Sequence, residues 1–110
     1  MTVTEMLRAA WQLIDQPKKW TKRVYCRDAN GFSTGSNPIC FCMVGALQRV
    51  GDGQTREKDA SEFLRHAICD VDPSANHGGP VTTWNDRPER NHADVARVFT
   101  RAIELAESKA

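Results

Sequence analysis

The sequence predicts a mainly α protein: four helices packed around a central buried helix, which is the second of the four, with a small extended or β-hairpin element between helices 1 and 2. Two observations carry this prediction. Apolar residues recur at helical spacing in residues 2–15, 59–69 and 91–108. Within residues 37–50, no polar stripe interrupts the run from Ile39 to Leu47, and a helix that is apolar on every side must be surrounded by protein.

The first helix is predicted over residues 2–15. Its regularly spaced apolar residues are Val3, Met6, Leu7, Ala10, Leu13 and Ile14. Thr2 and Glu5 are spaced as a capping box, in which each side chain accepts the backbone N–H of the other residue. Pro17 then ends the helix, because proline has no N–H to continue the hydrogen bonding.

The segment after the first helix favours extended structure. Residues 20–26 alternate roughly between apolar and polar and include aromatic and β-branched side chains, which is typical of a short strand. Residues 28–31 form a turn, since Asn-Gly readily takes positive φ. Residues 32–36 are then either the return strand of a hairpin or a loop.

The central helix is predicted to begin with Asn37 as its cap and Pro38 at its first position, where the missing N–H costs nothing. The glycine-rich residues 51–53 stop it. Gly45 lies inside the helix and costs about 1 kcal/mol relative to alanine. We therefore expect a neighbouring segment to approach the helix backbone closely at this glycine.

The remaining elements follow from the same patterns. Residues 59–69 predict the third helix, residues 70–80 a loop, and residues 81–84 a short extended piece. The last helix is predicted over residues 91–108, with Asn91 as its cap and an aspartate three positions later.

The composition fits one soluble domain, residues 1–110. The net charge of +1, from 15 Lys and Arg against 14 Asp and Glu, argues against a nucleic-acid binder. The basic run at Lys18, Lys19, Lys22 and Arg23 is more typical of a solvated segment.

The chain is expected to stay in the cytoplasm and not to insert into a membrane. Its first residues are amphipathic and carry acidic side chains, unlike a targeting segment. The longest apolar run is too short to cross a bilayer. In a reducing compartment the 4 cysteines would be thiols and would act as small buried hydrophobes.

Several motifs occur together along the chain. They are Cys40-x-Cys42-x-x-Gly45-Ala46-Leu47, Trp84-Asn85-Asp86 and, upstream, Trp20, Tyr25, Arg27-Asp28 and Gly31. With these motifs the chain resembles a family of small bacterial and phage proteins of unknown function, over residues 3–106. The resemblance implies a phage-related protein and brings no established activity with it.

A thiol-dependent site is one hypothesis. Cys40 would occupy the third position of the central helix, where backbone N–H groups and the positive helix end lower a thiol pKa. His77 or His92 would act as the base, oriented by Asn85 or Asp86, as in cysteine hydrolases. The alternative is that Cys40 only fills the core.

The sequence predicts no metal site and no cofactor. Cys40 and Cys42 are two residues apart, and on a helix such residues point to nearly opposite sides, so they would not share a zinc ion. Residues 70–74 resemble the start of a calcium loop, but Ala75 and Val81 stand where glycine and glutamate are needed.

A polar cleft is the other candidate site. Aromatic and charged residues that converge on one cleft suit a small ligand. The candidate binding residues are Trp20, Tyr25, Arg27, Asp28, Trp84, Asn85, Asp86 and Arg90. The structural alternative is that Trp84 anchors its loop in the core while Asn85 and Asp86 accept backbone N–H groups in the turn before Pro88.

The leading functional hypothesis is a non-enzymatic binding or interaction module, because the residues form no recognisable catalytic constellation. Its partner would be an unknown protein, and the apolar face of the last helix leaves a homodimer open. Two alternatives remain: a thiol-dependent hydrolase or transferase that uses Cys40, and a protein that sequesters a small, nucleotide-like ligand.

Overall fold

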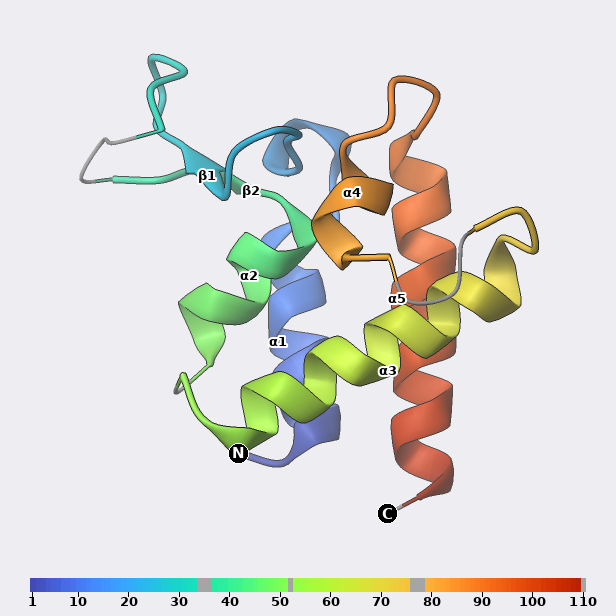
Figure 1. Cartoon of the computed structure of the whole chain (residues 1–110). Coiled ribbons are helices and arrows are strands. Elements are labelled where there is room, and N and C mark those ends of the chain that lie inside the picture. The colour runs from blue at the N-terminus through green and yellow to red at the C-terminus, as the bar shows by residue number, and fades with distance from the viewer. Residues whose placement is uncertain (34–36, 52, 76–78, 110) are drawn as a thin grey trace.

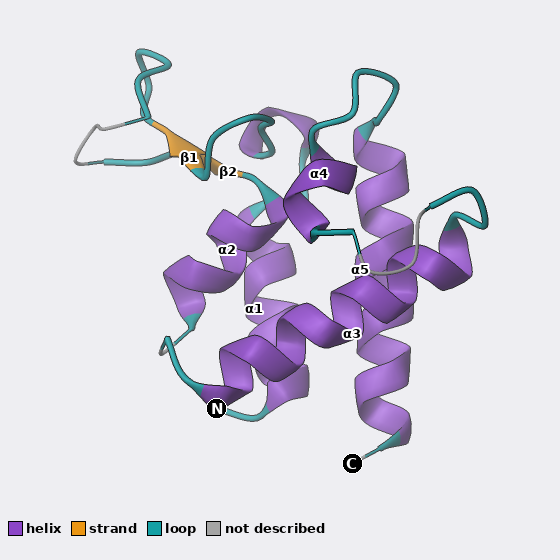
Figure 2. Ribbon diagram, in the orientation of Figure 1, coloured by secondary structure: helices purple, strands orange, loops and turns teal. Residues whose placement is uncertain are grey.

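The computed structural model describes residues 1–33, 37–51, 53–75 and 79–109. Within them lie α1 (Val3–Leu13), the 3-10 helix η1 (Pro17–Lys19), β1 (Cys26–Arg27), β2 (Cys40–Phe41), α2 (Met43–Val50), α3 (Thr55–Val71), α4 (Val81–Asn85) and α5 (His92–Ser108) (Figure 1). Helices make up most of this part of the chain, and the two short strands lie at one end of the molecule (Figure 2). The prediction of a mainly α fold with a hairpin between the first two helices is confirmed.

The helices pack in two groups that share α1 and α3. The most extensive helix–helix interface is between α3 and α5, and α1 packs on both. The shorter α2 packs on α1, α3 and α4, so the last helix is held mainly by α3 and α1 rather than by α2. Side chains buried completely between these helices include Leu7, Ile14, Met43, Leu64, Val95, Val98 and Phe99.

Both predicted capping boxes are confirmed. In α1 the Glu5 N–H donates to Thr2 Oγ1 at 3.1 Å and the Thr2 N–H donates to Glu5 Oε1 at 2.9 Å. In α5 the Asp94 N–H donates to Asn91 Oδ1 at 2.9 Å and the Asn91 N–H donates to Asp94 Oδ2 at 3.2 Å. The N-terminal N–H groups of these helices are therefore paired locally.

The start of α2 differs from the prediction. The helix begins at Met43 with Cys42 as its N-cap, so Asn37 and Pro38 do not start it. The residues before it are extended because β2 pairs antiparallel with β1, with Cys26 opposite Phe41. Exposure falls along this extended segment toward the helix, from 56% at Ile39 to 6% at Phe41.

Three further differences concern the other elements. The return strand of the hairpin is Cys40–Phe41 rather than residues 32–36, of which residues 34–36 lie outside the described part. The third helix is longer than predicted, from Thr55 to Val71. Residues 81–85 form the short helix α4 instead of an extended piece, because one helical turn buries both Val81 and Trp84.

The described helices include none that is both long and apolar enough to cross a membrane.

Gly45 provides the close approach that its position inside the helix predicted. A Cβ atom at this residue would overlap the backbone carbonyl oxygen of Tyr25. The carbonyl belongs to the segment that leads into β1 and is itself held, since it accepts the Cys42 N–H at 3.1 Å. The contact therefore joins the hairpin to the first turn of α2.

We predict that Gly45→Ala lowers the free energy of unfolding by about 1–3 kcal/mol, because the added methyl group meets backbone that cannot move aside easily. Urea denaturation measures the change. The control is Gln48→Ala, an exposed position on the same helix, where the substitution should be close to neutral. A Gly45→Ala protein as stable as the wild type would contradict the close approach.

Candidate functional site

Asn85, at the end of α4, connects three separate parts of the chain. Its side chain is completely buried. Oδ1 accepts the Trp20 Nε1–H at 2.7 Å and the Met43 N–H at 3.2 Å. Nδ2 donates to the Thr21 carbonyl at 3.1 Å and to Asp86 Oδ1 at 3.0 Å. All four hydrogen-bonding positions of the amide are used, so Asn85 fixes α4 against the segment after η1 and against the start of α2.

The next residue, Asp86, also binds the segment after η1. Its Oδ1 atom accepts the Arg23 N–H at 2.8 Å as well as the Asn85 amide. Arg23 has φ of +74°, a left-handed conformation that side chains other than glycine rarely adopt. The Asp86 carboxylate thus helps to hold a strained backbone, and strain of this kind concentrates at functional sites. The predicted acceptance of backbone N–H groups occurs, but the donors are on distant segments and not in the turn before Pro88.

A cleft of about 600 Å³ opens beside Asp86. One side is the segment between η1 and β1, and the other is α4 and the residue that caps α2. The lining residues are Arg23, Val24, Tyr25, Cys26, Ser33, Cys42, Thr82 and Asp86. Tyr25 and Asp86 are the two residues of the predicted cleft that line it.

Arg27 and Asp28 shape the hairpin instead of lining this cleft. The Arg27 guanidinium donates to Thr21 Oγ1 and to the Gly31 carbonyl, each at 3.0 Å. Asp28 Oδ1 accepts the N–H groups of Asn30 and Phe32, each at 2.9 Å. Both side chains therefore stabilise the loop that leads from β1.

Trp84 and Arg90 form a separate cluster with Asp72. The Arg90 guanidinium carbon lies 3.7 Å from the centre of the Trp84 ring, and its Nε donates to the Trp84 carbonyl at 3.0 Å. Asp72 Oδ2 accepts the Trp84 indole N–H at 3.0 Å and lies 3.4 Å from the Arg90 guanidinium. The cluster joins the end of α3 to α4 and to the start of α5, beside a second pocket of about 230 Å³.

The three catalytic candidates Cys40, His92 and Asp86 contact different segments of the chain. Cys40 is in β2, with its sulfur 3.8 Å from the Arg27 carbonyl. It therefore does not lie in the first turn of a helix, where it was expected to have a lowered pKa. His92 Nε2 lies 2.6 Å from the Ile14 carbonyl, and its ring stacks on Trp11. The other proposed base, His77, lies outside the described residues.

Cys42 is one of the cleft residues that were not predicted from the sequence, together with Arg23, Val24, Cys26, Ser33 and Thr82. It caps α2, accepting the Gly45 N–H on its sulfur at 3.2 Å. Burial raises the pKa of the Cys42 thiol, and the nearby Asp86 carboxylate adds to the rise. A neutral thiol is a poor nucleophile. The role of Cys42 as the helix cap could have been inferred from the sequence, because it directly precedes Met43 and is followed by a glycine three residues later.

Across residues 1–33, 37–51, 53–75 and 79–109, no group of three or more His, Cys, Asp and Glu side chains is arranged to hold a metal ion.

The Asp72 cluster predicts an acid-dependent loss of stability. Hydrogen bonds from Ser74 and from the Trp84 indole hold the pKa of the Asp72 carboxyl below its usual value. The stabilisation by the Asp72 carboxylate is therefore fully present above the ordinary aspartate pKa of about 4. It is lost as the pH falls through the lower pKa of the folded state. We expect Asp72→Asn to destabilise the protein at neutral pH, with a difference from the wild type that shrinks in acid.

Urea denaturation at a series of pH values measures this difference. Asp59→Asn is the control, because Asp59 is exposed on α3 and should have little effect at any pH. A deficit for Asp72→Asn that stays constant down to the most acidic condition would contradict the assigned role of the carboxylate.

The Asn85 network makes a second stability prediction. Asn85→Ala leaves the Trp20 indole N–H and the Met43 N–H without their shared acceptor, and each buried unpaired group costs about 1–3 kcal/mol. We expect a lower denaturation midpoint and a shift of the Trp20 fluorescence. Asn30→Ala, at an exposed position of the hairpin, is the matched control. Equal stability of the two variants would show that the Asn85 hydrogen bonds contribute little.

Comparisons with known proteins give a family and no activity. No curated protein and no solved structure matches the chain. The model of a family of unknown function, DUF6197, matches residues 1–105. Because this match covers nearly the whole chain, including the hairpin and the residues named above as lining the cleft, the protein belongs to that family.

Proposed function

We propose that the protein is a non-enzymatic interaction module that binds an acidic, partly apolar segment of a partner protein through the β1–β2 hairpin and the residues beside it. One observation carries this proposal. Tyr25, Phe32 and Ile39 are 53%, 65% and 56% exposed. Tyr25 directly precedes β1, Phe32 lies between β1 and β2, and Ile39 directly precedes β2. Large apolar side chains gathered on one exposed element are typical of an interaction site.

The hairpin is well placed for such contacts. It projects away from the helices at the end of the molecule opposite the two chain termini (Figure 1). Its base is anchored, because the Tyr25 carbonyl accepts the Cys42 N–H and the Ile39 N–H donates to the Arg27 carbonyl at 2.9 Å. An anchored base allows the exposed side chains to be presented with little loss of conformational entropy on binding.

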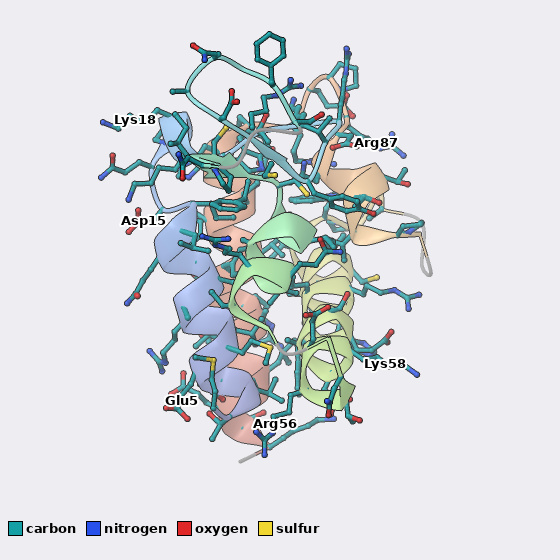
Figure 3. All side chains as sticks on the ribbon, turned by 90° about the vertical axis from the view of Figure 1, so that its left-hand side faces the viewer. Glu5, Asp15, Lys18, Arg56, Lys58 and Arg87 are labelled. Atoms are coloured by element: carbon teal, nitrogen blue, oxygen red, sulfur yellow. The ribbon has the colours of Figure 1, made fainter. Side chains whose placement is uncertain are left out.

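The charge around the hairpin favours an acidic partner. Residues 17–42 contain five basic side chains and one acidic side chain, whereas the chain as a whole carries only +1. Lys18 and Arg87 lie at the hairpin end of the molecule (Figure 3). Lys22 lies there too, because its ammonium group donates to the Arg87 carbonyl at 2.7 Å. A positive field of this kind speeds and orients the binding of an acidic segment.

The thiol chemistry favours a binding role over a thiol-dependent enzyme. Cys40 has a backbone carbonyl as its nearest partner, and Cys42 has a raised pKa. The four free cysteines support a location in a reducing compartment, and we propose the cytoplasm. A phage-related role is part of the same proposal and rests on the sequence resemblance alone.

Selection from a displayed library of random peptides tests the proposal without a known partner. We expect the selected peptides to combine acidic with apolar residues, and their affinity to fall with added salt. The double variant Phe32→Ser/Ile39→Ser should bind them about tenfold more weakly or worse, which corresponds to about 1.4 kcal/mol. Selected peptides that are basic, or that bind the double variant as tightly as the wild type, would contradict the proposal.

Charge reversal separates the electrostatic contribution. Lys18→Glu, at the hairpin end, should weaken the selected peptides, while Lys58→Glu, an exposed lysine on α3 far from the hairpin, should not (Figure 3). A concentration-dependent doubling of the protein's mass that is lost in Phe32→Ser/Ile39→Ser would instead identify a second copy of this chain as the occupant and overturn the acidic partner.

A further inference from the structure

We propose that the cleft beside Asp86 binds a small zwitterionic molecule, one that carries both a protonated amine and a carboxylate, of which a free α-amino acid is the simplest case. The proposal rests on one observation: a negative side chain, Asp86, and a positive side chain, Arg23, line the same cleft. This site shares Tyr25 with the proposed hairpin surface but is otherwise separate from it, because neither Phe32 nor Ile39 lines the cleft.

The cleft has the dimensions of a small-molecule site. Its volume of about 600 Å³ lies within the range of about 300–1,000 Å³ that is usual for ligand pockets. Its walls are held by hydrogen bonds that already exist without a ligand, above all those from Arg23 and Asn85 to Asp86 Oδ1. A cleft that is formed in advance binds with a smaller entropic cost.

Neither charge, Asp86 or Arg23, has an ion-pair partner among the residues that the structure describes. Elsewhere carboxylates that are similarly shielded from solvent are paired: Asp72 and Asp94 both lie near Arg90. The unpaired charges in the cleft therefore match a ligand that brings a charge of each sign.

One atom of Asp86 is available for the ligand's amine. Oδ1 already accepts two hydrogen bonds, whereas Oδ2 accepts none from the described residues. A protonated amine that donates to Oδ2 would form a charge-assisted hydrogen bond, the stronger kind. Thr82 lies one helical turn before Asp86 and also lines the cleft, so it adds a hydroxyl-bearing residue to the lining.

The rest of the lining suits the body of such a molecule. Tyr25 is half exposed and lines the cleft, and an aromatic ring also attracts a nearby ammonium group. Val24 and the neutral thiol of Cys42 provide apolar surface. Arg23 supplies the guanidinium, whose planar donors fit a carboxylate.

Ligand-observed NMR and isothermal titration calorimetry with the standard free α-amino acids test this assignment on the wild-type protein. At least one free amino acid should bind, whereas its N-acetyl derivative and its decarboxylated amine should bind about 10- to 100-fold more weakly, the loss expected for one charged hydrogen bond. Absence of binding by every free amino acid would overturn the proposal. So would equal binding of the N-acetyl derivative or of the decarboxylated amine.

The decisive variant is Asp86→Asn. Its amide oxygen can take the place of Oδ1 and keep the hydrogen bonds from the Arg23 N–H and the Asn85 amide, so the substitution removes the charge and the free acceptor while retaining the fold. We expect a similar 10- to 100-fold loss of affinity. Asp59→Asn, an exposed carboxylate outside the cleft, should bind as the wild type does. Unchanged binding by Asp86→Asn would overturn the role of Asp86.

Two further measurements keep the outcome clear. If Asp86→Asn is destabilised, the N-acetylated and decarboxylated ligands decide the question on the wild-type protein alone. Phe32→Ser/Ile39→Ser should keep full affinity for the amino acid, because its substitutions lie outside the cleft. Loss of peptide binding and loss of amino-acid binding are therefore separate results, and either proposal can fail without the other.

Discussion

The buried amide of Asn85 is the interaction on which the other features of the functional end depend. It places an acceptor between the Trp20 indole and the Met43 N–H, and a donor between Thr21 and Asp86. Together with the hydrogen bond from the Cys42 N–H to the Tyr25 carbonyl, this amide fixes the segment before β1 relative to α2. The cleft and the anchored base of the hairpin both need that position, because their residues come from these same segments.

Local signals were sufficient for much of the helical framework. Each capping box, at Thr2 and at Asn91, involves only four consecutive residues. The periodic apolar faces of the same helices are also visible in the local sequence alone. The start of α2 could not be found in this way. Its boundary depends on the pairing of Phe41 with Cys26, which is a contact between distant segments, and an apolar run alone does not distinguish a buried strand from a buried helix.

The site shows the same division. Tyr25 and Asp86 were identified as cleft residues from their types, whereas Cys42 and Thr82 were not, because nothing in their local sequence indicates that α4 lies over the cap of α2. Arg90 and Trp84 were assigned to the same cleft, yet they are held by Asp72, a loop residue with no periodic signal. Residue type shows which groups are able to bind a ligand, and only the fold shows which are already occupied by the protein.

The hydrogen bonds that build the cleft span very long stretches of chain. Those from Trp20 to Asn85 and from Arg23 to Asp86 join residues 65 and 63 positions apart. Closing so long a loop is costly until the helices between its ends have docked. During synthesis the segment that carries Trp20 and Arg23 leaves the ribosome long before α4 does, and its partners do not yet exist. The functional end is therefore completed late, and a nascent chain acquires it only after most of the domain has been made.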